Sequence, residues 1–388
     1  MAIQWKRHGR GIMFSCAVDA ASGLLRRCLA MTAILSLVAC SLFQADHFGS
    51  RPMTFEQLPG WLDDNHAQAL EVFTSSCDLM AQKTPSRSSG SGIKVPKDVW
   101  QSLCSDAQSV PPGNSVAARL FFERRFVPYR ITNNGHDKGL CTGYYEPVLY
   151  GSLKKHGDFK YPLYMRPADL KNGHSYYTHA EIDQGALKGR HLELVWVDDP
   201  VMIFFLQIQG SGLIRLDKGG SMLVGYDGQN NQTYVSLGKV MGDENLLPKD
   251  DINFFTLRQW LYDYPDRAFE MMERNPSYVF FKKLDQSGPV GAVGNVLTPQ
   301  RSLAVDNHYI PYGLPLFMET ELPSLNGGAS EPFHRILIAQ DTGGAIRGPV
   351  RGDVFFGQGS QAEYLAGYMK GHGVYNLLVP KEIVGQLQ

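Results

Sequence analysis

The apolar positions in the first third of the chain recur with the period of an α-helix. We predict one helix at 63–79, which Asp63 or Asp64 can cap, and a second at 115–126. A stretch rich in Ser, Gly and Pro at 82–96 separates them and is expected to be a loop. The side chains expected to face the core are Leu70, Phe73 and Cys77 in the first helix and Val116, Leu120 and Phe121 in the second.

Short apolar runs between turn residues replace the helical period from position 139 to about 250. The strands predicted there are 161–165, 192–197, 201–208, 213–216 and 222–226. Helical periodicity returns at 252–263 and 266–274, and the second of these helices ends before Pro276.

The last third of the chain mixes strands with one helix. A strand is predicted after Pro276, at 278–281, and further strands are predicted at 290–297, 316–318 and 335–339. A final helix begins at Ser360, where Ser360 and Glu363 have the spacing of a capping box. Its expected buried face consists of Ala362, Leu365, Ala366 and Met369.

A strand-rich middle between helix-containing ends predicts an inserted all-β domain, around which the first and last thirds of the chain close. Gly accounts for 40 of the 388 residues and aromatic residues for 11%, which favours turns and strands over a helix bundle. A length of 388 residues is enough for about two domains. The net charge of −1 argues against a nucleic-acid-binding protein, and 43% hydrophobic residues argue against a mainly disordered chain.

The N-terminus has the pattern of a targeting segment. A long basic region precedes an apolar run at 28–38, which is too short to span a bilayer. The run ends in Leu37-Val38-Ala39-Cys40, small residues before a Cys, as in a bacterial lipoprotein cleavage box. We predict cleavage before a lipidated Cys40; an ordinary secretory signal with an incidental Cys is the alternative. Because the basic region is long, Met13 is a second candidate start.

Three cysteines remain after this leader, and they show neither a CxxC pair nor zinc-like spacing. In an oxidising compartment Cys77 and Cys104 can form a disulfide; the alternative is two buried thiols. Cys141 is the odd one and is expected to be a buried strand residue. The histidines are scattered and no H-E-x-x-H occurs, so neither a metal nor another cofactor is predicted.

Two aspartates bracket a Gly-rich loop near the C-terminus. Asp341 and Asp353 stand at the ends of apolar runs, and the segment between them contains Gly343 and Gly344. Glycines allow the backbone to approach a ligand closely. An Asp beside aromatic residues can have a raised pKa and act as a general acid. The alternative is that both aspartates are turn residues that bind nearby N–H groups.

Two further segments carry groups suited to sugar binding. In Thr142-Gly143-Tyr144-Tyr145, adjacent strand residues face opposite ways, so one tyrosine can face a cleft while the other packs in the core. The segment Gln207 to Gly212 ends a predicted strand with amides, a hydroxyl and glycines. It can line a groove that binds hydroxyl groups, or it can be a hairpin turn.

Several motifs in one order resemble the membrane-bound lytic murein transglycosylase A family. They are residues 58–61, 142–147, 204–212, 275–281 and 340–348, within about 55–380 of the chain. The resemblance implies a mainly β fold: a double-psi β-barrel domain with flanking helices, and a smaller inserted barrel-like β-domain. The groove for the glycan lies between them. The implied domains are a signal peptide at 1–39, a catalytic barrel at 40–149 and 282–388, and the insert at 150–281.

In the family pattern the catalytic aspartate maps to Asp353, and Asp341 lines the same site. The residues implied to bind substrate are Thr142, Gly143, Tyr144, Tyr145, Gln209, Gly210, Ser211, Gly212, Gly343 and Gly344. The chain departs from the pattern at His179, where the family usually has Arg, and at 230–236. There Asn231 replaces a Gly whose left-handed conformation it can adopt.

The implied activity is cleavage of the β-1,4 bond between N-acetylmuramic acid and N-acetylglucosamine, leaving 1,6-anhydromuramyl ends. The expected partners are peptidoglycan strands, a membrane that holds the lipid, and other cell-wall enzymes, with no nucleic acid. Ser41 after Cys40 favours the periplasmic side of the outer membrane in a Gram-negative source. Two alternatives stay open: a two-carboxylate β-barrel glycoside hydrolase, and a non-catalytic murein-binding lipoprotein.

Overall fold

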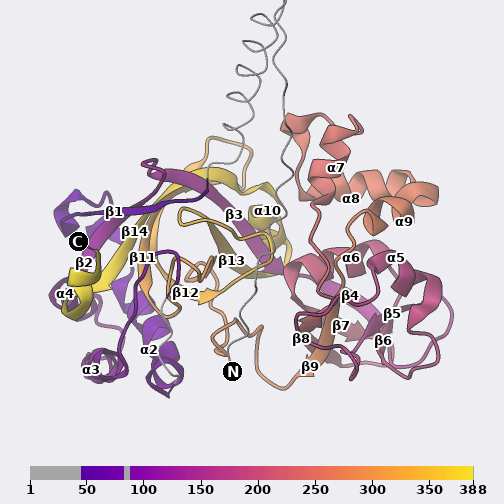
Figure 1. The fold of residues 1–388 in the computed structure, drawn as a ribbon, viewed down its shortest axis with the longest axis horizontal. Coiled ribbons are helices and arrows are strands. Elements are labelled where there is room, and N and C mark those ends of the chain that lie inside the picture. The colour runs from indigo at the N-terminus through magenta and orange to yellow at the C-terminus, as the bar shows by residue number, and fades with distance from the viewer. Residues whose placement is uncertain (1–44, 83–87, 388) are drawn as a thin grey trace, which may run out of the picture. The chain divides into compact units, whose positions relative to one another are not determined.

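The structure, a computed structural model, describes residues 45–82 and 88–387 (Figure 1). The predicted leader at 1–39 and the predicted lipidated Cys40 lie outside these residues. Among the residues described, no helix has both the length and the apolar character that a bilayer span requires.

Six strands close into a barrel that uses both ends of the chain. In order around the ring they are β3 (Lys138–Glu146), β13 (Gly352–Gln358), β10 (Ser302–Val305), β12 (Glu331–Asp341), β11 (Pro315–Leu322) and β14 (Lys370–Pro380). Strand β3 closes the ring because it pairs in parallel with β13 on one side and antiparallel with β14 on the other. Two more strands, β1 (Phe48–Pro52) and β2 (Phe126–Asn133), extend the sheet beside β14.

Three helices pack together beside the barrel: α2 (His66–Gln82), α3 (Lys97–Gln108) and α4 (Ser115–Arg125). The face of α4 is not the predicted one. Val116 and Leu120 are 61% and 41% exposed, whereas Phe121 and Phe122 are buried with Phe73 of α2. Helix α4 begins after Asn114, whose side chain accepts from the N–H of Ala117. The buried positions are then Ala118, Phe121 and Phe122, spaced three and four residues apart as one helix face requires.

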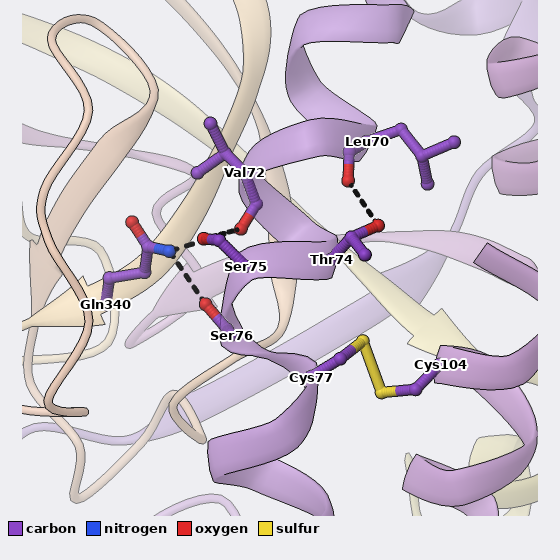
Figure 2. The surroundings of a disulfide bond; sticks show 8 residues. All are labelled: Leu70, Val72, Thr74, Ser75, Ser76, Cys77, Cys104 and Gln340. Carbon is purple, nitrogen blue, oxygen red and sulfur yellow. Dashed lines mark hydrogen bonds between the residues drawn. A yellow bond between two sulfur atoms is a disulfide. The ribbon is translucent and has the colours of Figure 1, made fainter. Parts of the chain in front are cut away.

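A disulfide joins Cys77 of α2 to Cys104 of α3, with Cα atoms 5.4 Å apart (Figure 2). Helix α3 was not among the predicted elements. One residue before the bridge, Ser76 Oγ accepts from Nε2 of Gln340 on β12 at 2.7 Å. Gln340 Oε1 in turn accepts from Ser302 of β10 at 2.5 Å. The disulfide-bonded helices are thereby tied to the two strands that end nearest the Gly-rich loop.

The second β region is a six-stranded sheet. Its strands in spatial order are β5 (Tyr161–Tyr164), β6 (Glu193–Val197), β4 (Val148–Ser152), β7 (Ser211–Leu216), β8 (Ser221–Gln229) and β9 (Val279–Leu284). Its core is apolar and includes Leu149, Val195 and Phe281. Helices α7, α8 and α9 lie together at one end of this part (Figure 1). The helices of the region are α5 (His179–Glu181), α6 (Pro200–Gln209), α7 (Leu237–Asp243), α8 (Phe254–Asp263) and α9 (Pro265–Glu273). Together with the barrel, this confirms the predicted mainly β fold.

The strand predicted at 201–208 is wrong, because this apolar run forms helix α6. Asp199 caps the helix by accepting from the N–H groups of Val201 and Met202, and Pro200 occupies the first turn. Gly210 ends it with φ 82°, a left-handed conformation that glycine adopts without cost. The run is apolar all round because it is buried, so its periodicity gave no sign of a helix.

Two smaller predictions also fail. The segment 290–297 is a loop with a single bridge between Val290 and Val296, not a strand. The last helix, α10 (Ser360–Tyr368), has no capping box, because Gly359 is its cap residue and the Glu363 carboxylate binds Arg258 instead. The predicted buried face of α10 is correct. Cys141 is a buried free thiol in β3, as expected.

Candidate active site

The two aspartates of the Gly-rich loop lie on either side of strand β10. Asp341 at the end of β12 and Asp353 near the start of β13 are both register partners of Ala304. Neighbouring strands are about 4.8 Å apart, so the two backbones are separated by roughly 10 Å. Register partners point to the same face of a sheet, and the small side chain of Ala304 leaves the space between the two carboxylates open. Leu303 and Val305 point the other way, into the barrel core.

Asp353 is held through one of its two oxygens. Thr142, its register partner on β3, donates its hydroxyl to Asp353 Oδ1 at 2.6 Å. Thr142 Oγ1 accepts in turn from Arg351 Nη2 at 2.8 Å. Burial raises the pKa of Asp353, while the Arg351 charge and the Thr142 hydrogen bond pull it back down. No donor among the described residues reaches Oδ2, so this oxygen is left for a ligand.

Both carboxylate oxygens of Asp341 accept hydrogen bonds from the protein. Tyr144 donates its hydroxyl to Oδ2 at 2.8 Å, and the N–H of Ala292 donates to Oδ1 at 3.1 Å. Burial raises the pKa of Asp341 to about 6, against these hydrogen bonds and with a further contribution from the charge of Asp353. A carboxylate with both oxygens occupied is a poor proton donor. Asp341 is therefore better placed to hold Tyr144 and to supply negative charge than to protonate a substrate.

An apolar cluster surrounds the two carboxylates and accounts for their desolvation. It consists of Tyr144, Leu297, Ala304, Ile346 and Phe355. The rings of Tyr144 and Phe355 lie 5.2 Å apart between centroids. Removing water from a carboxylate disfavours its charged form, so this cluster keeps the acid form of Asp353 populated at higher pH.

The Gly-rich loop is anchored to the strand that separates the aspartates. Asp306, directly after β10, accepts from the N–H of Gly348 at 2.9 Å, and Thr342 donates its hydroxyl to the carbonyl of Val305 at 2.9 Å. The sequence reasoning missed Asp306; its only signal is a carboxylate directly after an apolar run. Of the predicted loop glycines, Gly344 faces open space, and Gly343 lies against Ile346.

The structure divides the predicted tyrosine segment between two faces of β3. Thr142 and Tyr144 meet the aspartates, as described above. Gly143 faces Phe356 and helix α10, where an added Cβ would lie 2.5 Å from the Phe356 ring and 2.9 Å from Ala366 Cα. Tyr145 is buried on that same side and packs against Phe254, 5.7 Å between ring centroids. Packing is therefore the observed role of Gly143 and Tyr145.

The predicted groove segment 209–212 lies at the junction of α6 and β7. Gln209 Oε1 accepts from the N–H of Tyr145 at 3.0 Å, which ties the helix end to β3. An added Cβ at Gly212 would meet Leu206 at 2.5 Å. Ser211 pairs with Gly225 of β8 and is buried. No hydrogen bond within the described residues joins this segment to either aspartate.

Tyr234 is a second residue that the sequence reasoning missed. It lies in the segment after β8, and burial together with the charge of Asp353 raises its pKa. In the same segment Asn231 has φ 56°, the left-handed conformation expected of it. His179 is buried, and desolvation lowers the pKa of its imidazole to about 4, so the ring is neutral at pH 7.

A cavity of about 450 Å³ lies away from the aspartates. Its walls include Tyr145, Glu146, Asp199, Arg258 and Glu363, and neither aspartate lines it. In the part of the chain that the structure describes, no group of three or more His, Cys, Asp or Glu side chains could hold a metal ion.

Comparison with known proteins assigns the chain to a family. Residues 140–282 match the family described as the MltA specific insert domain, and residues 301–379 match the 3D domain. MltA from Neisseria gonorrhoeae, in its monoclinic crystal form, is 31% identical with a TM-score of 0.71, and the match covers 85% of this chain and 92% of that one. The chain belongs to the membrane-bound lytic murein transglycosylase A family.

Two further members of the MltA family match over a smaller part of their length. Membrane-bound lytic murein transglycosylase A of Vibrio cholerae is 35% identical over 237 residues, which is 60% of this chain and 63% of that protein. The structure of Escherichia coli MltA with bound chitohexaose has a TM-score of 0.60 and 28% identity, and the match covers 73% of this chain and 82% of that one.

Proposed function

We propose that the protein is a peptidoglycan lytic transglycosylase that cleaves the β-1,4 bond between N-acetylmuramic acid and N-acetylglucosamine, with Asp353 as its acid and base. The observation that carries this proposal is the difference between the two aspartates. Asp353 keeps one oxygen free of protein donors in an apolar cluster, whereas Asp341 has both oxygens occupied.

A single acid is enough for this reaction. Ordinary glycosidases use two carboxyl groups, one of which acts as a nucleophile or activates water. In a transglycosylase the C6 hydroxyl of the muramyl residue attacks its own anomeric carbon, an intramolecular step that needs no external nucleophile. Asp353 first protonates the leaving glycosidic oxygen and then accepts the C6 hydroxyl proton. The product is a 1,6-anhydromuramyl end.

The charge of Asp341 supports this mechanism from two strands away. At neutral pH a carboxyl group with a pKa of about 6 is mostly ionised, and its negative charge favours the positive character that develops at the anomeric carbon. Its hydrogen bond fixes the Tyr144 hydroxyl, and the Tyr144 ring forms one wall of the apolar cluster. The charge of Asp353 also raises the pKa of Tyr234, in the segment after β8.

The substrate and the domain roles follow from the family. The related MltA of Escherichia coli has been crystallised with chitohexaose, a linear β-1,4 glycan. By analogy the glycan of this protein lies between the barrel, 40–149 with 282–388, and the insert, 150–281. Of the two predicted glycines in the Gly-rich loop, Gly344, which faces open space, is the better placed to let a sugar approach.

Attachment to the cell envelope is part of the proposal. The relatives are membrane-bound by name. Lipidation of Cys40 after removal of residues 1–39 would tether the enzyme to a membrane and place it on the periplasmic side of the outer membrane, beside the peptidoglycan. Other cell-wall enzymes are expected partners there.

Digestion of purified sacculi tests the activity and the role of Asp353 together. The wild-type protein is expected to release fragments with the mass of anhydro ends, and Asp353→Asn is expected to lower the rate by about a thousandfold, because the proton donor is lost. Asp266→Asn, which removes an exposed carboxylate from α9, is the matched control and is expected to keep wild-type activity.

The product mass separates the alternatives. Fragments heavier by one water would show a hydrolase, in which Asp341 shares the chemistry. Binding of murein without soluble fragments, unchanged in Asp353→Asn, would show a wall-binding protein. Full activity of Asp353→Asn would refute the assignment of Asp353.

A further inference from the structure

Three polar side chains form an unbranched chain that ends at Asp353. Arg351 Nη2 lies 2.8 Å from Thr142 Oγ1, and Thr142 Oγ1 lies 2.6 Å from Asp353 Oδ1. Arg351 directly precedes β13, Asp353 is the second residue of that strand, and Thr142 of β3 is the parallel register partner of Asp353. The arrangement therefore depends on the pairing of two strands that are far apart in the sequence.

The donor and acceptor types fix the direction of both hydrogen bonds. A guanidinium group has donors and no acceptor, so Thr142 must accept from Arg351. The threonine hydroxyl has one hydrogen, and with Arg351 on its acceptor side that hydrogen is left for Asp353 Oδ1. In the acid form of Asp353, Oδ1 then acts as the carbonyl-type acceptor and Oδ2 carries the proton.

We propose that Arg351 is the positioning residue for Asp353: through Thr142 it holds Oδ1 as an acceptor and so directs the acidic proton, on Oδ2, toward the glycosidic oxygen. This inference rests on the proposed function of Asp353. It adds a role for a residue that no sequence motif singled out.

The position of Arg351 supports a role at a distance. Its other terminal nitrogen, Nη1, donates to the carbonyl of Gly352 at 2.5 Å, which fixes the side chain against the start of β13. Within the described residues Arg351 forms no direct ion pair with a carboxylate. Its charge therefore acts on Asp353 across the threonine hydroxyl, where it favours the ionised form without blocking the free oxygen.

The other groups around Asp353 have different effects. The titratable neighbours from the surrounding strands and the inserted region are Cys141 and Tyr144 of β3, Asp341 of β12, Tyr375 of β14 and Tyr234 after β8. Burial raises the pKa of each of these groups. Arg351 is the cation that lowers the pKa of Asp353, so its removal should raise that pKa.

The test compares Arg351→Met, which removes charge and donors, with Arg351→Lys, which keeps both. Rates of anhydro-product release from soluble glycan strands are measured across pH, and the carboxyl pKa of Asp353 is followed by ¹³C NMR. Arg351→Met is expected to lower kcat by about tenfold to a hundredfold with KM nearly unchanged. Arg351→Met should also move the alkaline limb of the pH profile and the NMR pKa of Asp353 upward. In Arg351→Lys the rate and the pKa of Asp353 should lie close to the wild-type values.

Thr142 variants show whether the effect passes through the hydroxyl group. Thr142→Ser keeps the hydroxyl and is expected to behave like the wild type, whereas Thr142→Val should resemble Arg351→Met. The combined variant should shift the Asp353 pKa by less than the sum of the two single shifts, because they break one chain.

Two results would overturn the inference. One is an unchanged pH profile and NMR pKa in folded Arg351→Met; the other is additive shifts in the double variant. Because the NMR titration needs no turnover, it tests the inference even in a protein without activity on murein. Inactivity of the wild type or full activity of Asp353→Asn would instead reject the proposed function.

Discussion

The two site aspartates share one sheet face, and their hydrogen-bond partners make them different. Asp353 has a single protein donor and a neighbouring cation, and Asp341 has donors on both oxygens and a pKa raised to about 6. Buried carboxyl groups with raised pKa values reduce stability as they ionise, because the unfolded chain ionises at lower pH. Each aspartate therefore has a measurable effect on folding apart from catalysis.

The pH dependence of stability tests the state of Asp341. Its pKa is about 6 in the folded protein against an ordinary value of 3.8, so its contribution to stability falls as pH rises from about 4 to about 6. Asp341→Asn removes this loss. The Tm of the variant relative to wild type should be higher by a few degrees at pH 7 than at pH 4, as followed by circular dichroism. The exposed Asp266→Asn serves as the control, and equal differences at both pH values would contradict the prediction.

The sequence predicts only part of such a site. Asp341, Asp353, Thr142 and Tyr144 are visible as polar residues at strand ends or in an alternating segment, where one face can be assigned to a cleft. Arg351 is not visible, because its contact with Thr142, 209 residues away in the chain, depends on the pairing of β13 with β3. Strand register over such distances follows from the closed barrel and from no local pattern.

At the scale of elements, local sequence patterns predict an element and its buried face correctly where only one face of that element is buried. The face of α10 was predicted because its apolar residues recur at helical spacing. Helix α6 was mistaken for a strand because it is apolar on all sides, although Asp199, Pro200 and Gly210 carried the end signals of a helix. For short buried runs, such end signals are therefore better evidence than periodicity.

The disulfide between α2 and α3 gives a prediction at this scale. A loop of 27 residues corresponds to about 3.5 kcal/mol of stabilisation in the chain-entropy model. Replacing Cys77 and Cys104 by Ser should lower the free energy of unfolding by roughly this amount, measured by urea denaturation. Reductant should destabilise the wild type and Cys141→Ser alike, and it should leave the double variant unaffected. A wild type that reductant does not destabilise would contradict the bond.

At the scale of the whole described fold, the barrel and the second sheet are connected by specific side chains as well as by the backbone. Arg258 of α8 binds Glu363 of α10 at 2.5 Å, and both side chains are 26% exposed. The guanidinium group also stacks over Phe254 and Phe255, 4.7 and 5.5 Å from the ring centroids. This contact stands at the wall of the 450 Å³ cavity.

A double-mutant cycle measures that connection. Arg258→Met and Glu363→Met are expected to show a coupling energy of about 1 kcal/mol in urea unfolding, because the pair is partly buried and supported by aromatic rings. The exposed pair of Lys239 and Asp243 within α7 is the control and should couple by less than about 0.5 kcal/mol. Equal coupling in the two pairs would contradict the prediction.

The closure of the barrel by β3 has a consequence for the order of synthesis. Thr142 leaves the ribosome 211 residues before Asp353, and β14, the strand that flanks β3 on its other side, comes later still. A nascent chain that lacks β13 cannot bring the hydroxyl and the carboxylate together. Under the proposed function, the catalytic site therefore cannot form until translation is almost complete.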